Sequence, residues 1–176
     1  VSMCNKLIDA YNEPHRHYHT MNHVYSCLNL LDGLPVAEET KNKLEFAIWF
    51  HDVIYDSASQ TNEIESATLA YEWLEHSDVS YALEVKRMIE LSVDYVNAQL
   101  TKETEKFFHD LDLAILGSSE ITYQEYVTNI RREYAHMSDD KFAAGRSSFL
   151  TKIIEKQKIF QTDAFHDLFE ETAREN

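Results

Sequence analysis

Five of the nine histidines of this chain lie in two short stretches, HRHYHTMNH at residues 15–23 and FHDVIYD at residues 50–56. In the second stretch, an adjacent His51–Asp52 pair adjoins the apolar run FAIWF at residues 46–50. A carboxylate in such surroundings needs a partner, because an unpaired buried charge is costly or neutralises itself. A metal ion is a partner that also explains the histidines. Metal binding is therefore the first chemistry that the sequence suggests.

Helical spacing brings several of these side chains to inward faces. His19 and His23 are four residues apart, so they share one helix face about one turn from each other. His51 continues the apolar stripe of the next expected helix, and Asp52 is its neighbour around the turn. Much later in the chain, Asp112 aligns with apolar residues of its own helix. Two imidazoles (His23, His51) and two carboxylates (Asp52, Asp112) suit one divalent ion of Mn, Fe, Co, Ni, Zn or Mg, and spacing does not choose among these metals.

Each of these residues also has a structural interpretation. A single histidine on an apolar face is often a hydrogen-bonded core residue, a His-Asp pair occurs by chance, and Asp112 alone would suit a helix cap. The combination of four such residues on three inward faces favours the metal site. A rival zinc site is excluded by geometry, since His19 and Cys27 would lie ~12 Å apart along one helix axis, too far for bonds of ~2.0–2.3 Å to one ion. Cys27 is expected to pack in the core.

Helices are the elements that must position these residues. Three Gly and two Pro among 176 residues are too few for the many tight turns of an all-β fold. A hydrophobic content of 44% predicts a packed core. No linker divides the chain, so one all-α domain over residues 1–176 is expected. The pattern predicts helices over residues 3–12, 20–31, 38–54, 62–76, 79–93, 101–116, 122–136, 139–159 and 163–174.

The charge of the chain limits its partners. A formal net charge of −15 predicts repulsion of nucleic acid and of anionic membranes. A phosphorylated substrate would be repelled too, unless a bound cation reverses the local sign. No apolar stretch approaches the roughly 20 residues that span a bilayer, and two cysteines do not form a disulfide framework. We therefore expect a cytoplasmic protein with no nucleic-acid or membrane partner.

Four motifs stand in order along the chain: Arg16 with YHTMNH at 18–23, FHDVIYD at 50–56, DLDLAILG at 110–117 and RREY at 131–134. Together they resemble the HD-domain superfamily of metal-dependent phosphohydrolases, and most of all a small bacterial branch of predicted HD phosphohydrolases. The resemblance spans nearly the whole chain. It implies an HD-type helical bundle of about eight to nine helices.

The resemblance also implies roles for individual residues. His23, His51, Asp52 and Asp112 would be the metal ligands. YHTMNHV is similar to a segment of cyclic-nucleotide phosphodiesterases in which the first histidine acts as an acid, which implies this role for His19. Many HD enzymes bind a second metal through histidines between the HD pair and the last Asp, but LSVDY at 91–95 stands where relatives carry one of them. One metal ion is therefore expected, and a second is doubtful.

The expected function is hydrolysis of a phosphate ester or anhydride of a small, nucleotide-like or other molecule. A metal-bound hydroxide would attack phosphorus, Asp52 would orient it, and His19 would protonate the leaving oxygen. Arg16 would either clamp phosphoryl oxygens or form a surface salt bridge. The RREY motif is interpreted as a structural ion-pair cluster. Two alternatives remain open, a non-catalytic metal- or nucleotide-binding module and a purely structural helical protein.

Overall fold

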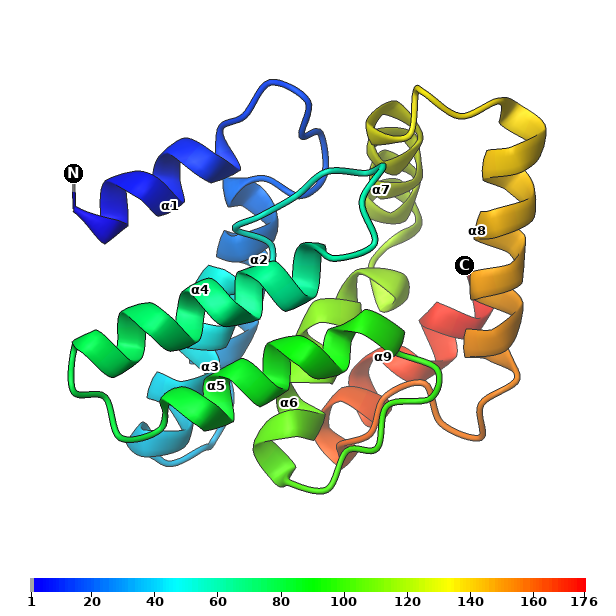
Figure 1. Ribbon diagram of the computed structural model, residues 1–176. Coiled ribbons are helices and arrows are strands. Elements are labelled where there is room, and N and C mark those ends of the chain that lie inside the picture. Colours follow the sequence, from blue (N-terminus) through cyan, green and yellow to red (C-terminus); the bar gives the residue numbers. More distant parts are fainter. Residues whose placement is uncertain (1) are drawn as a thin grey trace.

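The computed structural model describes residues 2–176 of the chain. Nine α-helices and two short 3-10 helices make up its regular structure, and no strand occurs among these residues (Figure 1). The prediction of an all-α fold of eight to nine helices is confirmed. The elements are α1 (Met3–Tyr11), α2 (Met21–Asp32), α3 (Glu38–Phe50), α4 (Asn62–His76), α5 (Ala82–Leu91), η1 (Ser92–Asp94), α6 (Glu103–Leu113), η2 (Ala114–Gly117), α7 (Glu120–Glu133), α8 (Asp139–Ile154) and α9 (Asp163–Glu175).

Helix α3 packs against four other α-helices, α2, α4, α5 and α6. Its inward face carries Leu44, Ala47 and Ile48, which are at most 1% exposed and follow the three- and four-residue spacing of an amphipathic helix. Helices α4 and α5 run side by side along this part of the molecule (Figure 1). The C-terminal end of α3, where the His51–Asp52 pair lies, is thereby held among packed helices.

The contact between η2 and α9 depends on a glycine. A Cβ atom on Gly117 would come within 2.6 Å of the Cβ atom of Phe169, so only a residue without a side chain allows this close approach. Asp110 on α6 joins the same region, since its carboxylate accepts hydrogen bonds from the backbone N–H groups of Gln161 and Thr162 at 2.7 Å each. These contacts fix α9 against the end of α6.

Helix α8 packs much less closely than the other long helices. Its sixteen residues bury only Ile153, whereas α6 buries seven of its eleven residues. Figure 1 shows α8 at one side of the molecule, beyond α7. Its half-buried Phe142 and Phe149 pack against the edge of the core and also line a cavity. No helix in the described part of the chain combines the length and the apolar character needed to cross a bilayer.

The most consequential difference from the predicted helix ends concerns residues 38–54, because this helix ends at Phe50. His51 caps it, and the following residues form a turn in which the N–H of Val53 bonds to the carbonyl of Phe50 at 3.2 Å. The N–H of Ile54 then donates to the hydroxyl of Ser66 on α4 at 3.0 Å. Asp52 therefore lies on a turn, where its side chain is not restricted to a helix face.

Candidate metal centre

The four predicted ligands meet in the structure. The Nε2 atoms of His23 and His51 are 3.0 Å apart. Asp52 Oδ2 lies 3.0 Å from His51 Nε2 and 3.7 Å from His23 Nε2. Asp112 Oδ1 lies 3.1 Å from His23 Nε2 and 3.6 Å from His51 Nε2. We call these four side chains the metal cluster, since they are positioned to form a possible metal site.

These separations fit ligands of a single ion. Two atoms that are each ~2.1 Å from one metal lie ~3.0 Å apart at a right angle and ~3.4 Å apart at a tetrahedral angle. The five separations in the metal cluster, from 3.0 to 3.7 Å, fall at or near these values. A donor set of two imidazoles and two carboxylates suits divalent first-row metals and does not identify one of them.

Hydrogen bonds orient the histidine rings of the metal cluster. The carbonyl oxygen of Ile48 lies 2.8 Å from His51 Nδ1 and can only accept, so Nδ1 carries a hydrogen and Nε2 is the nitrogen that faces the metal cluster, where a metal ion would take the place of its proton. On the other ring, His23 Nδ1 lies 4.0 Å from Cys27 Sγ, whose thiol donates to the carbonyl of Leu111 at 3.6 Å. Cys27 is buried beside the ring, where burial raises its pKa well above the usual value and keeps the thiol protonated.

The charges of the metal cluster favour a cation. Burial raises the pKa of Asp52, but the charges of His51 and His19 and the hydrogen bond from His51 together outweigh burial and hold this pKa far below its usual range. The pKa of Asp112 is lowered in the same way, against burial, mainly by His51. Burial lowers the pKa of His51, yet the two carboxylates raise it well above its usual value. The surroundings thus stabilise positive charge between two ionised carboxylates, which a divalent ion would supply.

The side chains of the metal cluster come from three helices and the turn after one of them. His23 lies in the first turn of α2, and Asp112 lies in the last turn of α6. His51 is the C-cap of α3, and Asp52 follows it. The C-terminal ends of α3 and α6 both face the metal cluster, and helix C-termini carry partial negative charge that adds to the attraction for a cation.

Arg16 has a different role from either of those that the sequence suggested. Its side chain is fully buried, and its guanidinium donates to the backbone carbonyls of Asp52 at 2.5 Å, Val53 at 3.0 Å and His19 at 3.3 Å. Its Nε donates to the carboxylate of Glu13 at 2.9 Å. A buried guanidinium with these bonds cannot clamp a substrate phosphoryl group, and the expected salt bridge, to the partly exposed Glu13, is only one of its contacts. Arg16 holds the turn that carries Asp52.

His19 is fixed by a carboxylate from a distant helix. Its Nδ1 lies 2.7 Å from Glu133 Oε2, which also accepts a hydrogen bond from the Tyr55 hydroxyl at 2.7 Å. Since the carboxylate accepts, His19 carries a hydrogen on Nδ1, and its Nε2 points towards Asp52 Oδ2 at 4.0 Å. The second oxygen of Glu133 accepts from three backbone N–H groups of the His19 segment, those of residues 17, 18 and 19.

Glu133 was not recognised from the sequence as part of the site. The RREY motif predicts a cluster of ion pairs, and Arg131 does form one, with Asp139 at 2.6 Å, but Glu133 pairs with His19, outside the motif. Burial raises the pKa of Glu133, but the hydrogen bonds and the charge of His19 and the hydrogen bond from Tyr55 together outweigh burial and lower this pKa to about 2. One signal was present, since Tyr126, Ile130 and Glu133 follow the spacing of one inward helix face, which makes the glutamate buried and in need of a partner.

Tyr95 is a second residue that the sequence did not assign. It belongs to the LSVDY segment, and its hydroxyl donates a hydrogen bond to Asp112 Oδ2, the oxygen turned away from His23. The two histidines between the HD pair and Asp112 lie elsewhere. His109 Nε2 faces the carbonyl of Tyr95 at 3.3 Å, and the exposed His76 bonds to a carbonyl of its own helix. Neither belongs to a group of possible metal ligands within residues 2–176.

Two cavities reach the metal cluster, and Tyr18 and Tyr126 line both. The first, of about 500 Å³, lies between the body of the protein and α8, and we call it the α8 cavity. Asp52, Asp112 and His19 all line it. The second, of about 540 Å³, is lined by the neutral amides Asn22, Asn29 and Asn129 and contacts His23 and Asp112. The volumes of both are within the usual range for small-molecule sites.

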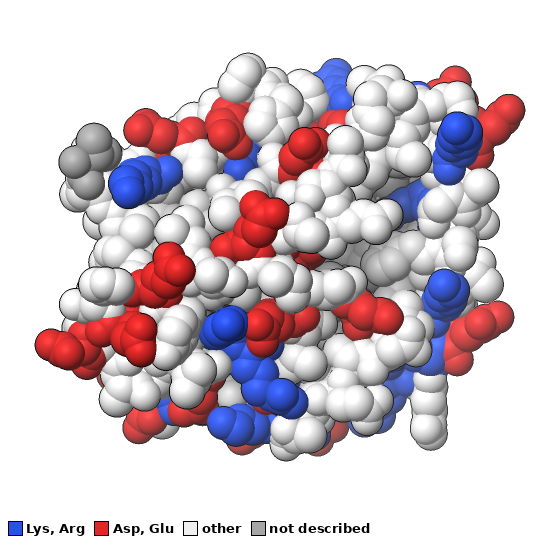
Figure 2. Space-filling view, viewed as in Figure 1, with Lys and Arg blue, Asp and Glu red and all other residues white. Residues whose placement is uncertain are grey.

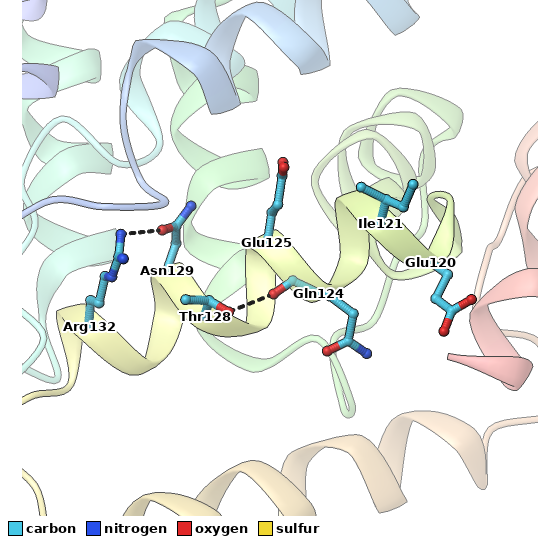
Figure 3. Close-up of a pocket in the computed structure, with 7 residues that line it drawn as sticks. All are labelled: Glu120, Ile121, Gln124, Glu125, Thr128, Asn129 and Arg132. Atoms are coloured by element: carbon cyan, nitrogen blue, oxygen red, sulfur yellow. Dashed lines mark hydrogen bonds between the residues drawn. The ribbon is translucent and has the colours of Figure 1, made fainter.

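A third hollow lies along the outer face of α7, and its lining includes neither His19 nor any residue of the metal cluster. All seven of its lining residues come from that single helix, and their side chains project outward from it (Figure 3). The hydrogen bonds drawn there, Arg132 to Asn129 and Thr128 to Gln124, remain within the helix. One helix face cannot enclose a ligand, so this hollow is a surface groove.

Comparisons with known proteins returned no relative, since no family model, no curated protein and no solved structure matches this chain. The resemblance to the HD-domain superfamily therefore remains a prediction from four motifs.

Proposed function

We propose that the protein is a metal-dependent phosphohydrolase that acts on a small phosphorylated molecule. The observation that supports this most directly is that four metal-capable side chains converge at one wall of a cavity that His19 also lines. A divalent ion held there would polarise a bound water and neutralise phosphoryl oxygens. In a chain with a net charge of −15, such an ion would also offset the repulsion of an anionic substrate.

Asp52 is suited to orient the attacking water. Its Oδ2 faces His51 and His19, at 3.0 and 4.0 Å, and its carboxylate lines the α8 cavity. A carboxylate in this position accepts a hydrogen bond from water and directs the water oxygen towards a phosphorus atom bound in the cavity. Arg16 contributes by holding the backbone carbonyl of Asp52.

His19 is suited to protonate the leaving oxygen. Glu133 holds the hydrogen of Nδ1, so the proton to be donated sits on Nε2, which faces the metal cluster. When the phosphorus–oxygen bond breaks, this proton would pass to the departing oxygen and the neutral ring would remain hydrogen-bonded to Glu133. The position and hydrogen bonding of the ring thus support a general-acid role.

The test is a panel of substrates assayed with the metal varied. The protein is stripped with a chelator and reloaded separately with Mn, Fe, Co, Ni, Zn or Mg, and it is assayed on nucleotides, sugar phosphates and p-nitrophenyl phosphate. We expect activity to require the metal and Asp52→Ala to abolish it. His76→Ala, at an exposed histidine outside the metal cluster, is the matched control and should retain full activity. Activity that survives chelation or Asp52→Ala would overturn the proposal.

The acid role of His19 has its own test. His19→Ala should slow hydrolysis of alkyl phosphates, whose leaving oxygen needs a proton, far more than hydrolysis of p-nitrophenyl phosphate, whose leaving group departs as an anion. Equal effects on both substrates would contradict this role. Binding of metal and nucleotide with no turnover across the panel would favour the alternative of a non-catalytic binding module.

A further inference from the structure

The α8 cavity has two walls of opposite charge. The metal cluster side carries the carboxylates of Asp52, Glu63 and Asp112. The α8 side carries Lys141 and Arg146, which are five residues apart on one helix. Figure 2 shows a hollow beside α8 with basic atoms on its α8 side. An anionic molecule in this cavity would therefore meet positive charge on the wall opposite the metal cluster.

Neither cation is neutralised by a carboxylate. Within residues 2–176, neither Lys141 nor Arg146 forms a salt bridge, although acidic residues outnumber basic ones by 31 to 16 in the chain. The half-buried guanidinium of Arg146 lies over the rings of Tyr126 and Phe149, at 4.8 and 5.4 Å from their centres, and donates to the Tyr126 hydroxyl at 2.5 Å. These contacts orient Arg146 and leave its charge available to a ligand.

The cavity between the two walls is largely aromatic. Its lining includes the rings of Tyr18, Tyr95, Tyr126, Tyr134, Phe142 and Phe149. Aromatic walls of this kind favour flat ring systems, which stack on them. Gly145 adds room on the α8 side, since a Cβ atom there would meet no atom within 4 Å. The cavity thus has the volume and lining for a ring placed between the metal cluster and the two cations.

The second cavity differs from the α8 cavity in the positive charge of its lining. Its lining includes no lysine or arginine, and its polar groups are amides, hydroxyls, the thiol of Cys27, the imidazoles of His17 and His23 and the carboxylates of Asp112 and Glu125. That lining therefore offers no permanent positive charge to a second anionic group. A substrate with two anionic groups therefore fits the α8 cavity and not the second cavity.

We propose that Lys141 and Arg146 form an anion subsite and that the ligand of the α8 cavity is a phosphorylated molecule with an aromatic ring and a second anionic group. This inference rests on the proposed function for the first phosphoryl group, which would lie at the metal cluster. The second anionic group would lie against the two cations of α8, and the ring would lie between the two. Lys141 and Arg146 are thus specificity-determining residues outside the catalytic machinery.

Equilibrium binding to the metal-loaded protein tests the subsite without requiring turnover. The probes are ribose 5-phosphate, adenosine 5′-monophosphate and adenosine 3′,5′-bisphosphate, which add first the ring and then the second anion. His19→Ala replaces the wild type for any probe that is hydrolysed. We expect each addition to strengthen binding, the second by about tenfold, which corresponds to ~1.4 kcal/mol. This second step should weaken as salt rises, because part of it is exposed charge attraction.

The double variant Lys141→Met/Arg146→Met should bind the bisphosphate and the monophosphate within about twofold of each other. Lys152→Met is the matched control, since Lys152 is on α8 but outside the cavity lining, and it should keep the tenfold preference. A second variant, Gly145→Leu, fills the open space of the cavity and should weaken both adenosine ligands more than ribose 5-phosphate.

The outcomes separate this inference from the proposed function. Hydrolysis of monophosphates with no preference for the bisphosphate, or a preference that survives the double variant, overturns the anion subsite and leaves the phosphohydrolase proposal intact. A bisphosphate preference that the double variant removes, with no turnover of any phosphate, supports the subsite and overturns the phosphohydrolase. No binding of any probe overturns the subsite.

Discussion

The C-terminal end of α3 and the cavity-facing side of α8 show two ways in which this protein places charged groups. At the end of α3, each ligand is held by buried contacts that involve the backbone, such as the bond from His51 to the carbonyl of Ile48. Along α8, Arg146 is held by aromatic rings and a single hydroxyl, on a helix that buries only Ile153. The first arrangement fixes atoms to the accuracy that metal coordination needs. The second leaves side chains adaptable, which suits recognition of a ligand.

The largest expected effect comes from removing a ligand. His51→Ala should lower metal affinity by more than about 100-fold, because losing a ligand exceeds the 10- to 100-fold cost of losing an outer hydrogen-bond partner. The measurement is metal content after dialysis against a competing chelator. His76→Ala should retain the wild-type metal content. Equal metal content in the two variants would show that the metal cluster does not bind the ion.

Arg16→Met should have the next largest effect, and it tests how the turn that carries Asp52 is held. It leaves the carbonyls of Asp52, Val53 and His19 without their donor in a buried environment, which should lower the free energy of unfolding by about 2–4 kcal/mol. Urea denaturation measures this loss. Arg16→Lys should rescue little, because an ammonium lacks the fork that reaches several carbonyls. A variant of normal stability with a raised KM alone would restore the interpretation of Arg16 as a phosphoryl clamp.

The pH dependence of the free energy of unfolding in Glu133→Gln tests the link between α7 and the His19 segment. The pKa of Glu133 is lowered from 4.5 to about 2 in the folded protein, so its stabilising effect is fully present above pH 4.5 and is lost as the pH falls towards 2. After allowance for solvent screening, we expect about 2 kcal/mol from this carboxylate. The wild type should lose this stability between about pH 4.5 and 2, and Glu133→Gln should lack that part of the loss. Parallel pH–stability curves would contradict the assignment.

The sequence predicted the helices and the four side chains of the metal cluster because both depend on local pattern. Scarce glycine and proline, apolar periodicity and the positions of His23, His51 and Asp112 are visible in the chain itself. The roles of Arg16 and Glu133 are not, since they arise from contacts between residues 36 to 116 positions apart. The end of α3 at Phe50 was missed for the same reason. The turn beyond it is held by Arg16 and Ser66, while its own apolar residues continue a helical pattern.

Adding a single methyl group at each of two glycines compares how closely η2 and α8 are packed. Gly117→Ala, where η2 packs against α9, would place a Cβ atom 2.6 Å from Phe169 Cβ and 2.6 Å from the backbone oxygen of Phe169. Backbone cannot move aside as a flexible side chain can, so we expect a loss of about 1–3 kcal/mol in thermal or urea unfolding. An unchanged free energy of unfolding would show that η2 and α9 are less tightly joined than their contact indicates.

Gly145→Ala on α8 should have the smallest effect and the opposite sign. A Cβ atom there meets nothing within 4 Å, and Gly145 lies within a helix, where alanine is favoured by roughly 0.5–1 kcal/mol. The same methyl group should therefore stabilise α8 and destabilise η2, and unfolding of both variants under one set of conditions measures the difference. Destabilisation by Gly145→Ala would mean that α8 packs against the body of the protein more closely in solution. In that case the α8 cavity would be smaller, and the anion subsite would have to lie nearer to the metal cluster.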